Sequence, residues 1–117
     1  LQCEVNLFEE IAKATNRIDK SHFVKMMDKG KTADFKYLVM ELIWLSLRDL
    51  KVKICGDSFT PPTIIKIARQ TLKSIESLHE VGFLHRDIKP ENFAAGLAPK
   101  DGIIYLLDFG IARPYRN

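Results

Sequence analysis

Two short stretches of the chain combine acidic, basic and amide side chains in a pattern that could carry out catalysis. Residues 85–92 read His-Arg-Asp-Ile-Lys-Pro-Glu-Asn, and residues 108–110 read Asp-Phe-Gly. A triplet such as Asp-Phe-Gly recurs by chance, but the two stretches together fix several residue identities at set offsets. The chance of that combination at one starting position is on the order of 10⁻¹⁰, so the two stretches are treated as one constellation.

These residue types suit the transfer of a phosphoryl group. The transition state of that reaction carries its charge on phosphate oxygens, so catalysis needs cations nearby and an acceptor that orients the attacking hydroxyl. Asp87 can accept the hydroxyl proton, and Lys89 can place an ammonium beside the phosphate. Asn92 and Asp108 offer hard oxygen ligands of the kind that Mg²⁺ prefers. We expect Gly110 to leave the backbone after Asp108 free to turn.

The elements that must position these residues can be predicted from the pattern of apolar residues. Helical spacing predicts a helix over 4–15. Apolar runs at 22–27 and 35–42, joined by a polar turn, predict a β-hairpin. Residues 43–60 are less regular, with a short helix beginning at Leu47.

A long helix is predicted over 61–81, because Thr60 suits the N-cap, Pro61 suits the first turn and Gly82 suits the end. Its apolar stripe is predicted to pack in the core. The members of that stripe are Ile64, Ala68, Thr71, Leu72, Ile75 and Leu78. Further along, short strands are predicted at 93–95 and 103–107, the second one buried on both faces.

The composition is that of an ordinary folded protein. The 117 residues carry 18 Lys and Arg against 15 Asp and Glu, a net charge of +3, and 46% are apolar. Disorder is excluded, and no run approaches the roughly 20 apolar residues that cross a bilayer. Basic residues are interleaved with acidic ones, so neither nucleic acid nor membrane is expected as a partner. Cys3 and Cys55 form no cluster and no signal peptide is visible, which favours an intracellular, cytoplasmic protein.

The two motifs resemble the catalytic loop and the metal-binding loop of the eukaryotic protein kinases, H-R-D-x-K-x-x-N and D-F-G. Lys89 is typical of the serine/threonine type. Residues 82–90, 92–94 and 106–113 are similar to the casein kinase 1 group, nearest its tau-tubulin kinase-like branch. The resemblance covers essentially the whole chain and implies a partial protein kinase-like fold of the α+β class.

The resemblance also implies a division of the chain into lobes. Residues 1–39 would be the remnant of the small lobe, 40–46 the hinge, and 47–117 the first part of the large lobe through the Asp-Phe-Gly loop. The hinge residues that meet the nucleotide would be Met40, Glu41, Leu42 and Ile43, with Met40 as the gatekeeper.

The first helix would be the regulatory helix of the small lobe on the same resemblance. Glu4 would be its ion-pairing glutamate near the nucleotide, and Phe109 would pack against it. The residues alone leave open a simpler role for Glu4, which is a favourable interaction with the helix dipole.

The implied activity is transfer of the γ-phosphoryl of ATP to a Ser or Thr hydroxyl of a protein substrate. Asp87 would orient the hydroxyl, Lys89 would steady the phosphate, and Asn92 and Asp108 would hold Mg²⁺.

Two features of the kinase family are missing from the 117 residues, a G-x-G-x-x-G loop and a V-A-I-K-like lysine. The resemblance places both upstream of Glu4, so we expect no appreciable transfer by the isolated chain and restored activity once those residues are supplied. The alternative is a truncated kinase-like binding module or a pseudokinase. The missing motifs favour that alternative, as does Trp44, which stands where the group usually has glycine.

Overall fold

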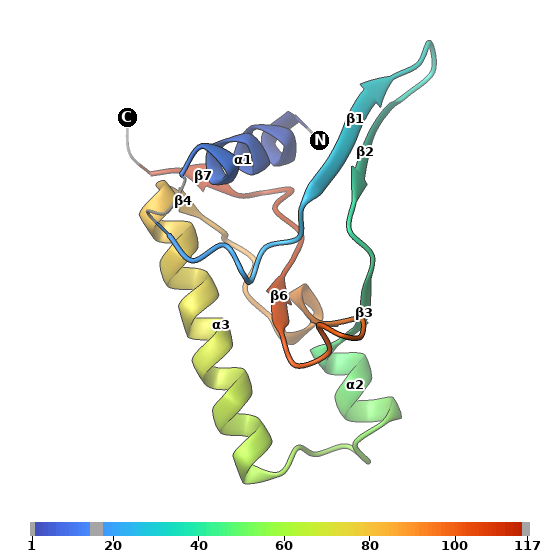
Figure 1. The fold of residues 1–117 in the computed structure, drawn as a ribbon, viewed down its shortest axis with the longest axis vertical. Coiled ribbons are helices and arrows are strands. Elements are labelled where there is room, and N and C mark those ends of the chain that lie inside the picture. Colours follow the sequence, from blue (N-terminus) through green and yellow to red (C-terminus); the bar gives the residue numbers. More distant parts are fainter. Residues whose placement is uncertain (1, 15–17, 116–117) are drawn as a thin grey trace.

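The computed structural model describes residues 2–14 and 18–115, which form helices and small antiparallel sheets (Figure 1). The helices are α1 (Gln2–Lys13), α2 (Leu47–Lys53) and α3 (Pro61–Val81), with a 3₁₀ turn η1 at Pro90–Asn92. The strands are β1 (Met26–Lys31), β2 (Lys36–Met40), β3 (Ile43–Ser46), β4 (Phe83–Leu84), β5 (Phe93–Gly96), β6 (Ile104–Leu106) and β7 (Arg113–Pro114). This mixed content confirms the α+β class.

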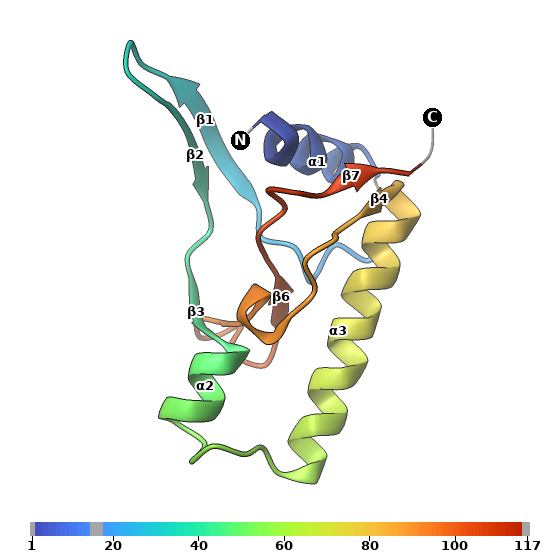
Figure 2. The same ribbon diagram turned by 180° about the vertical axis from the view of Figure 1, so that it is seen from behind.

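Antiparallel pairing groups the described strands as β1–β2, β3–β5–β6 and β4–β7. The β1–β2 hairpin projects from the rest of the molecule, whereas α1, β4, β7 and the end of α3 gather at one end (Figures 1 and 2). The β3–β5–β6 sheet positions both motifs, because β5 begins directly after Asn92 and β6 ends just before Leu107 and Asp108.

The core lies between α1, the segment before β1, and β6. Its large, fully buried side chains include Leu7, Leu78, Leu106 and Phe109. Removing a side chain of that size from water contributes about 1.5–3 kcal/mol. Because Phe109 belongs to the second motif, the core itself holds that motif in place.

The strand predicted over 103–107 is confirmed in its centre. Ile104, Tyr105 and Leu106 form β6, and all three are buried although neighbouring residues of a strand point to opposite faces. A strand buried on both faces is a rigid support for the residues that follow it.

The long helix α3 begins and ends where the sequence predicts. Thr60 occupies the N-cap position, but its side chain makes no capping bond and instead its hydroxyl lies 2.9 Å from the Thr63 hydroxyl. Gly82 ends the helix with a φ of 99°, and its amide donates to the carbonyl of His79 at 3.0 Å. Within residues 2–14 and 18–115, no helix is both long and apolar enough to span a bilayer.

The face of α3 that packs on the molecule differs from the predicted one. The predicted core residues that are exposed are Ile64, Ala68 and Leu72. The contact face instead carries the small residues Ser74 and Ser77, both 1% exposed, which let the helix approach closely. The Gln70 side chain bonds the backbone on both sides of Ile103, accepting from the Ile104 amide at 2.8 Å and donating to the Gly102 carbonyl at 3.1 Å. The prediction is confirmed for Leu78, which is in the core, and for Ile75, which packs against it, and it is wrong for the three exposed residues.

Two strands also differ from the sequence prediction. Residues 22–24 do not join the hairpin, because His22 bonds to β6 instead: its carbonyl accepts from the Leu106 amide at 2.9 Å and its Nδ1 lies 2.8 Å from the Ile104 carbonyl oxygen. Lys25 lies outside β1, but its carbonyl accepts from the Glu41 amide at 3.1 Å. Residues 43–46 form β3, although an irregular segment was predicted. β3 pairs with β5, which lies far along the chain, so no local pattern reveals it.

Replacing Gly82 by alanine is expected to lower the free energy of unfolding by about 1–2 kcal/mol. The left-handed backbone at Gly82 is costly for a residue with a Cβ, and a Cβ there would meet no atom within 4 Å, so the cost is purely conformational. Gly102→Ala is the matched control, since a Cβ at Gly102 also meets open space and its φ is not left-handed. Urea unfolding of both variants measures the difference, and equal midpoints would contradict this account of the helix end.

Candidate active site

Three of the predicted site residues meet in the loop between β4 and β5. The Asn92 side-chain amide donates to the carbonyl oxygen of Asp87 at 2.8 Å and to its carboxylate Oδ2 at 3.1 Å. The Lys89 ammonium lies 3.6 Å from the same Oδ2. Asn92 is buried, whereas the Asp87 side chain is 34% exposed. The loop therefore fixes the orientation of a carboxylate that a substrate can still reach.

His85 ties this loop to the second motif. Its Nδ1 accepts a hydrogen bond from the Asp87 amide at 3.1 Å, and its Nε2 lies 2.7 Å from the Leu107 carbonyl oxygen. A carbonyl can only accept, so the proton of the neutral ring is on Nε2. His85 is 2% exposed and its ring centroid lies 5.4 Å from that of Phe109. This arrangement agrees with a structural role for His85.

The β5–β6 pairing brings Asp108 beside the loop. The Leu107 amide donates to the Asn92 carbonyl at 2.8 Å, so the residue before Asp108 lies against Asn92. Among the hydrogen bonds of the described residues, the Asp108 carboxylate accepts from the Gly110 amide and not from Asn92. The backbone segments are thus adjacent, and convergence of the three side chains on one metal ion stays a prediction.

The turn after β6 depends on Asp108 rather than on Gly110. Asp108 has a φ of 59°, in the left-handed region that aspartate tolerates better than most residues. Gly110 is not left-handed, and a Cβ there would lie 3.3 Å from Oδ1 of Asp108. The prediction that Gly110 supplies the turning freedom is therefore wrong. Its missing side chain instead leaves room for the carboxylate.

A cavity of about 170 Å³ joins Asp108 to residues of α1 and of the hinge segment. The predicted site residues in its wall are Glu4, Met40, Glu41, Ile43 and Asp108. Leu42 is not part of the wall and is 80% exposed, because it lies at the bend between β2 and β3. The rest of the wall is apolar, and small-molecule sites usually combine apolar walls with a few polar groups; the volume is below the roughly 300–1,000 Å³ usual for such sites.

Phe109 packs against α1 as the resemblance implies. Its ring centroid lies 5.8 Å from that of Phe8, with the rings nearly perpendicular at 88°. Glu4, on the first turn of α1, reaches the cavity wall. Its lysine partner remains a prediction, because none of the ion pairs formed by residues 2–14 and 18–115 includes Glu4.

Glu41 is held by partners that the sequence did not reveal. Its Oε1 accepts from the Lys25 amide at 2.6 Å, and its Oε2 lies 3.2 Å from the Lys100 ammonium. The Lys25 amide is the main reason that the pKa of the Glu41 carboxyl is lowered; burial opposes this shift, and Lys100 adds to it. Lys25 precedes β1 and Lys100 follows β5, so the Glu41 carboxylate links the start of the hairpin to the turn between β5 and β6. Lys25 and Lys100 are both far from Glu41 in the sequence, so no local sequence pattern predicts these contacts.

The contribution of Glu41 to stability is expected to disappear in acid. A carboxyl whose pKa is lowered on folding stabilises the protein above its unfolded pKa, here near 4.5, and this stabilisation is lost as the pH falls through the folded pKa. Wild-type chain should therefore be more stable than Glu41→Gln at pH 7, and the difference should shrink below about pH 4.5. Denaturant unfolding between pH 7 and pH 3 measures that difference. The other carboxyl groups are present in both proteins, so their contributions to the pH dependence cancel in the difference. A gap independent of pH would contradict the assignment.

The donor set fits Mg²⁺. The Asn92 amide nitrogen is used in bonds to Asp87, which leaves its side-chain oxygen as an available acceptor, and Asp108 adds a carboxylate at the cavity wall. Within the described part of the chain, no three His, Cys, Asp or Glu side chains gather as a metal cage. That is compatible with Mg²⁺, which takes one or two carboxylates and relies on phosphates and waters for its other ligands.

Comparison with known proteins identifies the family. The family model described as "Protein kinase domain" matches residues 2–117, and the chain belongs to the protein kinase family. It is 41% identical over 116 residues to a Caenorhabditis elegans protein named "Putative serine/threonine-protein kinase ZK507.1", covering 99% of this chain and 35% of the relative. It is 40% identical over 116 residues to "Putative serine/threonine-protein kinase ZK507.3" of the same organism, covering 99% and 31%. The chain thus spans about a third of the length of these relatives.

Proposed function

We propose that the chain is the central part of a serine/threonine kinase domain of the casein kinase 1 group, nearest its tau-tubulin kinase-like branch. In the complete domain it would act inside the cell and move the γ-phosphoryl of ATP to a Ser or Thr hydroxyl of a protein. The observation that supports this most strongly is the carboxylate of Asp87, which Asn92 orients at 3.1 Å and Lys89 flanks at 3.6 Å.

In this proposal Asp87 accepts the proton of the attacking hydroxyl. Its carboxylate is oriented before substrate arrives, which lowers the reorganisation needed in the transition state. Lys89 places a positive charge where the phosphate oxygens gain negative charge. His85 keeps the loop in register with Asp108 through its bonds to Asp87 and Leu107.

The remaining predicted residues would bind the cofactors. Asn92 and Asp108 would hold Mg²⁺, which neutralises phosphate charge when it is bound. Met40, Glu41, Leu42 and Ile43 would contact the adenine, and Glu4 would pair with a lysine from a segment upstream.

The test inserts this chain into a longer relative, in place of the relative's matching segment. An exchange kinase, defined as the ZK507.1 protein with its matching 116 residues replaced by residues 2–117 of this chain, is assayed for ATP- and Mg²⁺-dependent phosphorylation of casein or tubulin. The same exchange is made in ZK507.3 as a second host. Transfer above that of the isolated 117-residue chain is expected, because the hosts supply the residues that flank the matched stretch.

One outcome would count against the proposal, and another would contradict only the expected inactivity of the isolated chain. An unmodified host that transfers phosphate while its exchange kinase does not would favour a pseudokinase or a binding module. Steady ATP-dependent transfer by the isolated chain would show that the missing glycine-rich loop and lysine are not required.

A further inference from the structure

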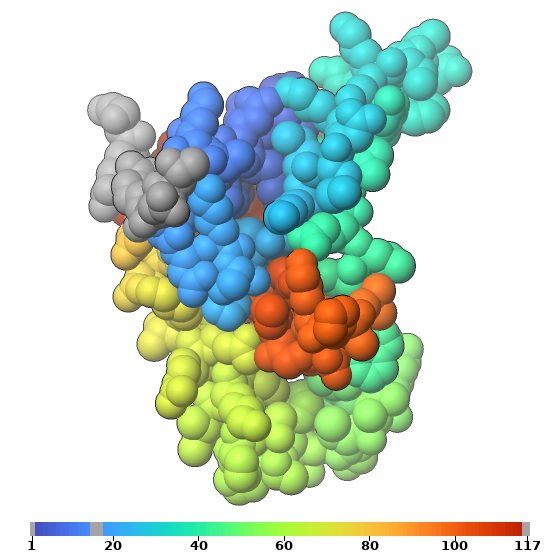
Figure 3. Space-filling model, in the orientation of Figure 1, coloured from blue at the N-terminus to red at the C-terminus, as the bar shows by residue number. Residues whose placement is uncertain are grey.

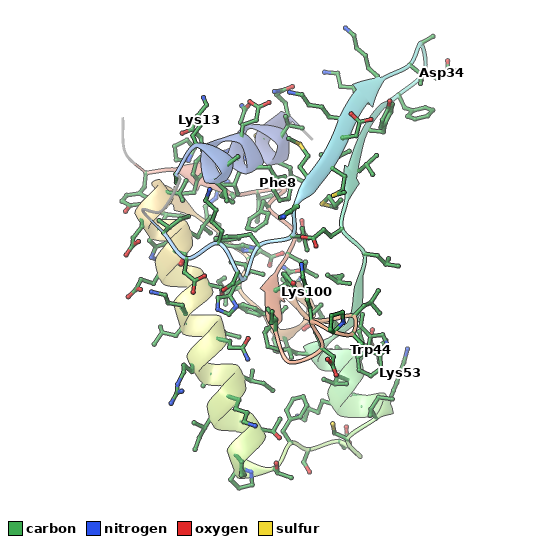
Figure 4. All side chains as sticks on the ribbon, in the orientation of Figure 1. Phe8, Lys13, Asp34, Trp44, Lys53 and Lys100 are labelled. Atoms are coloured by element: carbon green, nitrogen blue, oxygen red, sulfur yellow. The ribbon has the colours of Figure 1, made fainter. Side chains whose placement is uncertain are left out.

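A second and larger cavity lies behind the candidate active site. Its volume is about 420 Å³, within the usual range for small-molecule sites. It opens between α1, the segment that precedes β1, and the turn between β5 and β6. In Figure 3 the blue atoms of the segment before β1 lie beside the orange atoms of that turn, and Figure 4 labels Phe8 on α1 and Lys100 on the turn, both of which line the cavity. Phe8, Val24 and Glu41 line both cavities and separate them.

The inner wall of this second cavity is apolar. The apolar side chains that form it are Phe8, Ile11, Phe23, Val24, Met26 and Tyr105. Most of them are buried in the core, so the apolar wall is already formed before a ligand binds. This wall suits the hydrocarbon part of a ligand, whose removal from water is favourable.

The rim of the second cavity is cationic. Lys20, Lys25 and Lys100 line it, and Glu41 is the single acidic residue there. Glu41 is already occupied by the Lys25 amide and by Lys100. The Lys25 ammonium has no hydrogen bond or ion pair to any residue in 2–14 or 18–115. Three lysines and one glutamate therefore leave the rim with a net positive charge, although the Glu41 carboxylate attracts Lys25 as well as Lys100.

Tyr105 contributes its ring to the apolar wall. The residue is 4% exposed, but its hydroxyl is not among the buried side-chain atoms that lack a hydrogen-bond partner in the described part of the chain, so the hydroxyl is open to solvent. Gly96 keeps the β5–β6 turn tight against this ring, because a Cβ at Gly96 would collide with the Lys100 carbonyl oxygen and with Cε2 of Tyr105. The turn thereby places Lys100 beside Tyr105.

We propose that this second cavity binds a small arylalkyl carboxylate. The apolar part of the ligand fills the space between Phe8, Val24 and Tyr105, and its carboxylate pairs with Lys25 and Lys100 at the rim. The match rests on the volume, the apolar wall and the net positive charge of the rim. It requires neither nucleotide nor phosphoryl transfer, so its test is independent of the proposed kinase function.

The experiment follows amide chemical shifts of the 117-residue chain during titration with 4-phenylbutanoate. The matched uncharged probe is 4-phenylbutanamide, which has the same shape without the negative charge. Saturable shifts at Phe8, Ile11, Val24 and Tyr105 are expected with the carboxylate, and binding about tenfold weaker or more with the amide, since a charge-assisted bond is lost.

Surface variants identify the charges that matter. The double variant Lys25→Met, Lys100→Met is expected to weaken phenylbutanoate binding about tenfold or more, whereas Lys53→Met, at the end of α2 and outside the cavity, should leave it unchanged. All three lysines are exposed, so these variants should keep the fold. Absence of saturable shifts, equal binding of the two probes, unchanged binding by the double variant, or shifts centred on the exposed residues of α3 would each overturn the proposal.

Discussion

Replacing Asp87 by asparagine in the exchange kinase is expected to lower turnover by about 10²–10⁴-fold, the usual worth of a positioned general base. Asparagine has nearly the same shape but cannot accept the hydroxyl proton as a carboxylate does. The bond from Asn92 to the Asp87 carbonyl oxygen, at 2.8 Å, involves only the main chain at residue 87 and should survive the change. The loss should therefore appear in kcat and leave the KM for ATP nearly unchanged.

Asp101→Asn is the matched control for this prediction, because Asp101 is an exposed residue of the turn before β6 and lies outside the candidate active site. Initial rates of phosphate transfer to casein compare the two variants. Turnover by the Asp87 variant equal to that of the Asp101 variant would mean that another group orients the hydroxyl.

Replacing Phe109 by alanine is expected to lower the free energy of unfolding by about 3–5 kcal/mol, as for other buried phenylalanines. The ring is 2% exposed and lies against those of Phe8, Phe23 and His85, with centroid distances of 5.8, 6.2 and 5.4 Å. Since a whole domain is typically stable by only about 5–15 kcal/mol, this variant should lose most of its cooperative unfolding transition.

Phe35→Ala provides the comparison, since Phe35 is 61% exposed on the projecting hairpin and its removal should cost under about 1 kcal/mol. Urea unfolding followed by circular dichroism measures both variants. Similar losses for the two would show that Phe109 does not join α1 to the second motif.

The sequence predicted those elements whose signals are local. The bounds of α3 follow from Pro61 and Gly82, and the buried strand β6 follows from a short apolar run. β3 was missed because its four residues gain their hydrogen bonds from β5, which is distant in the sequence. The packed face of α3 was predicted only in part: Leu78 lies in the core as expected, but Gln70, Ser74 and Ser77 are polar and a search for apolar periodicity does not detect them.

The features of the candidate site also differ in how far the sequence predicted them. The motif predicts that Asp87 and Asn92 belong to one site, whereas the hydrogen bonds between their side chains were found only in the structure. The cavity that joins Glu4 to Asp108 forms through packing of α1 on Phe109, and only the family resemblance suggested it. The anchoring of Glu41 by Lys25 and Lys100 was not predicted, because it depends on the position of a turn that follows β5.

The proposed active site requires Asn92 and Asp108 to bind one divalent cation beside Asp87. Paramagnetic broadening by Mn²⁺, used in place of Mg²⁺, tests it directly in the chain labelled with ¹⁵N-asparagine. The side-chain amide of Asn92 should broaden at low Mn²⁺, the side-chain amide of Asn6 on α1 should stay sharp as an internal reference, and Asp108→Asn should abolish the effect. Broadening of Asn92 that persists in the Asp108 variant, or that affects Asn6 equally, would contradict the shared metal site.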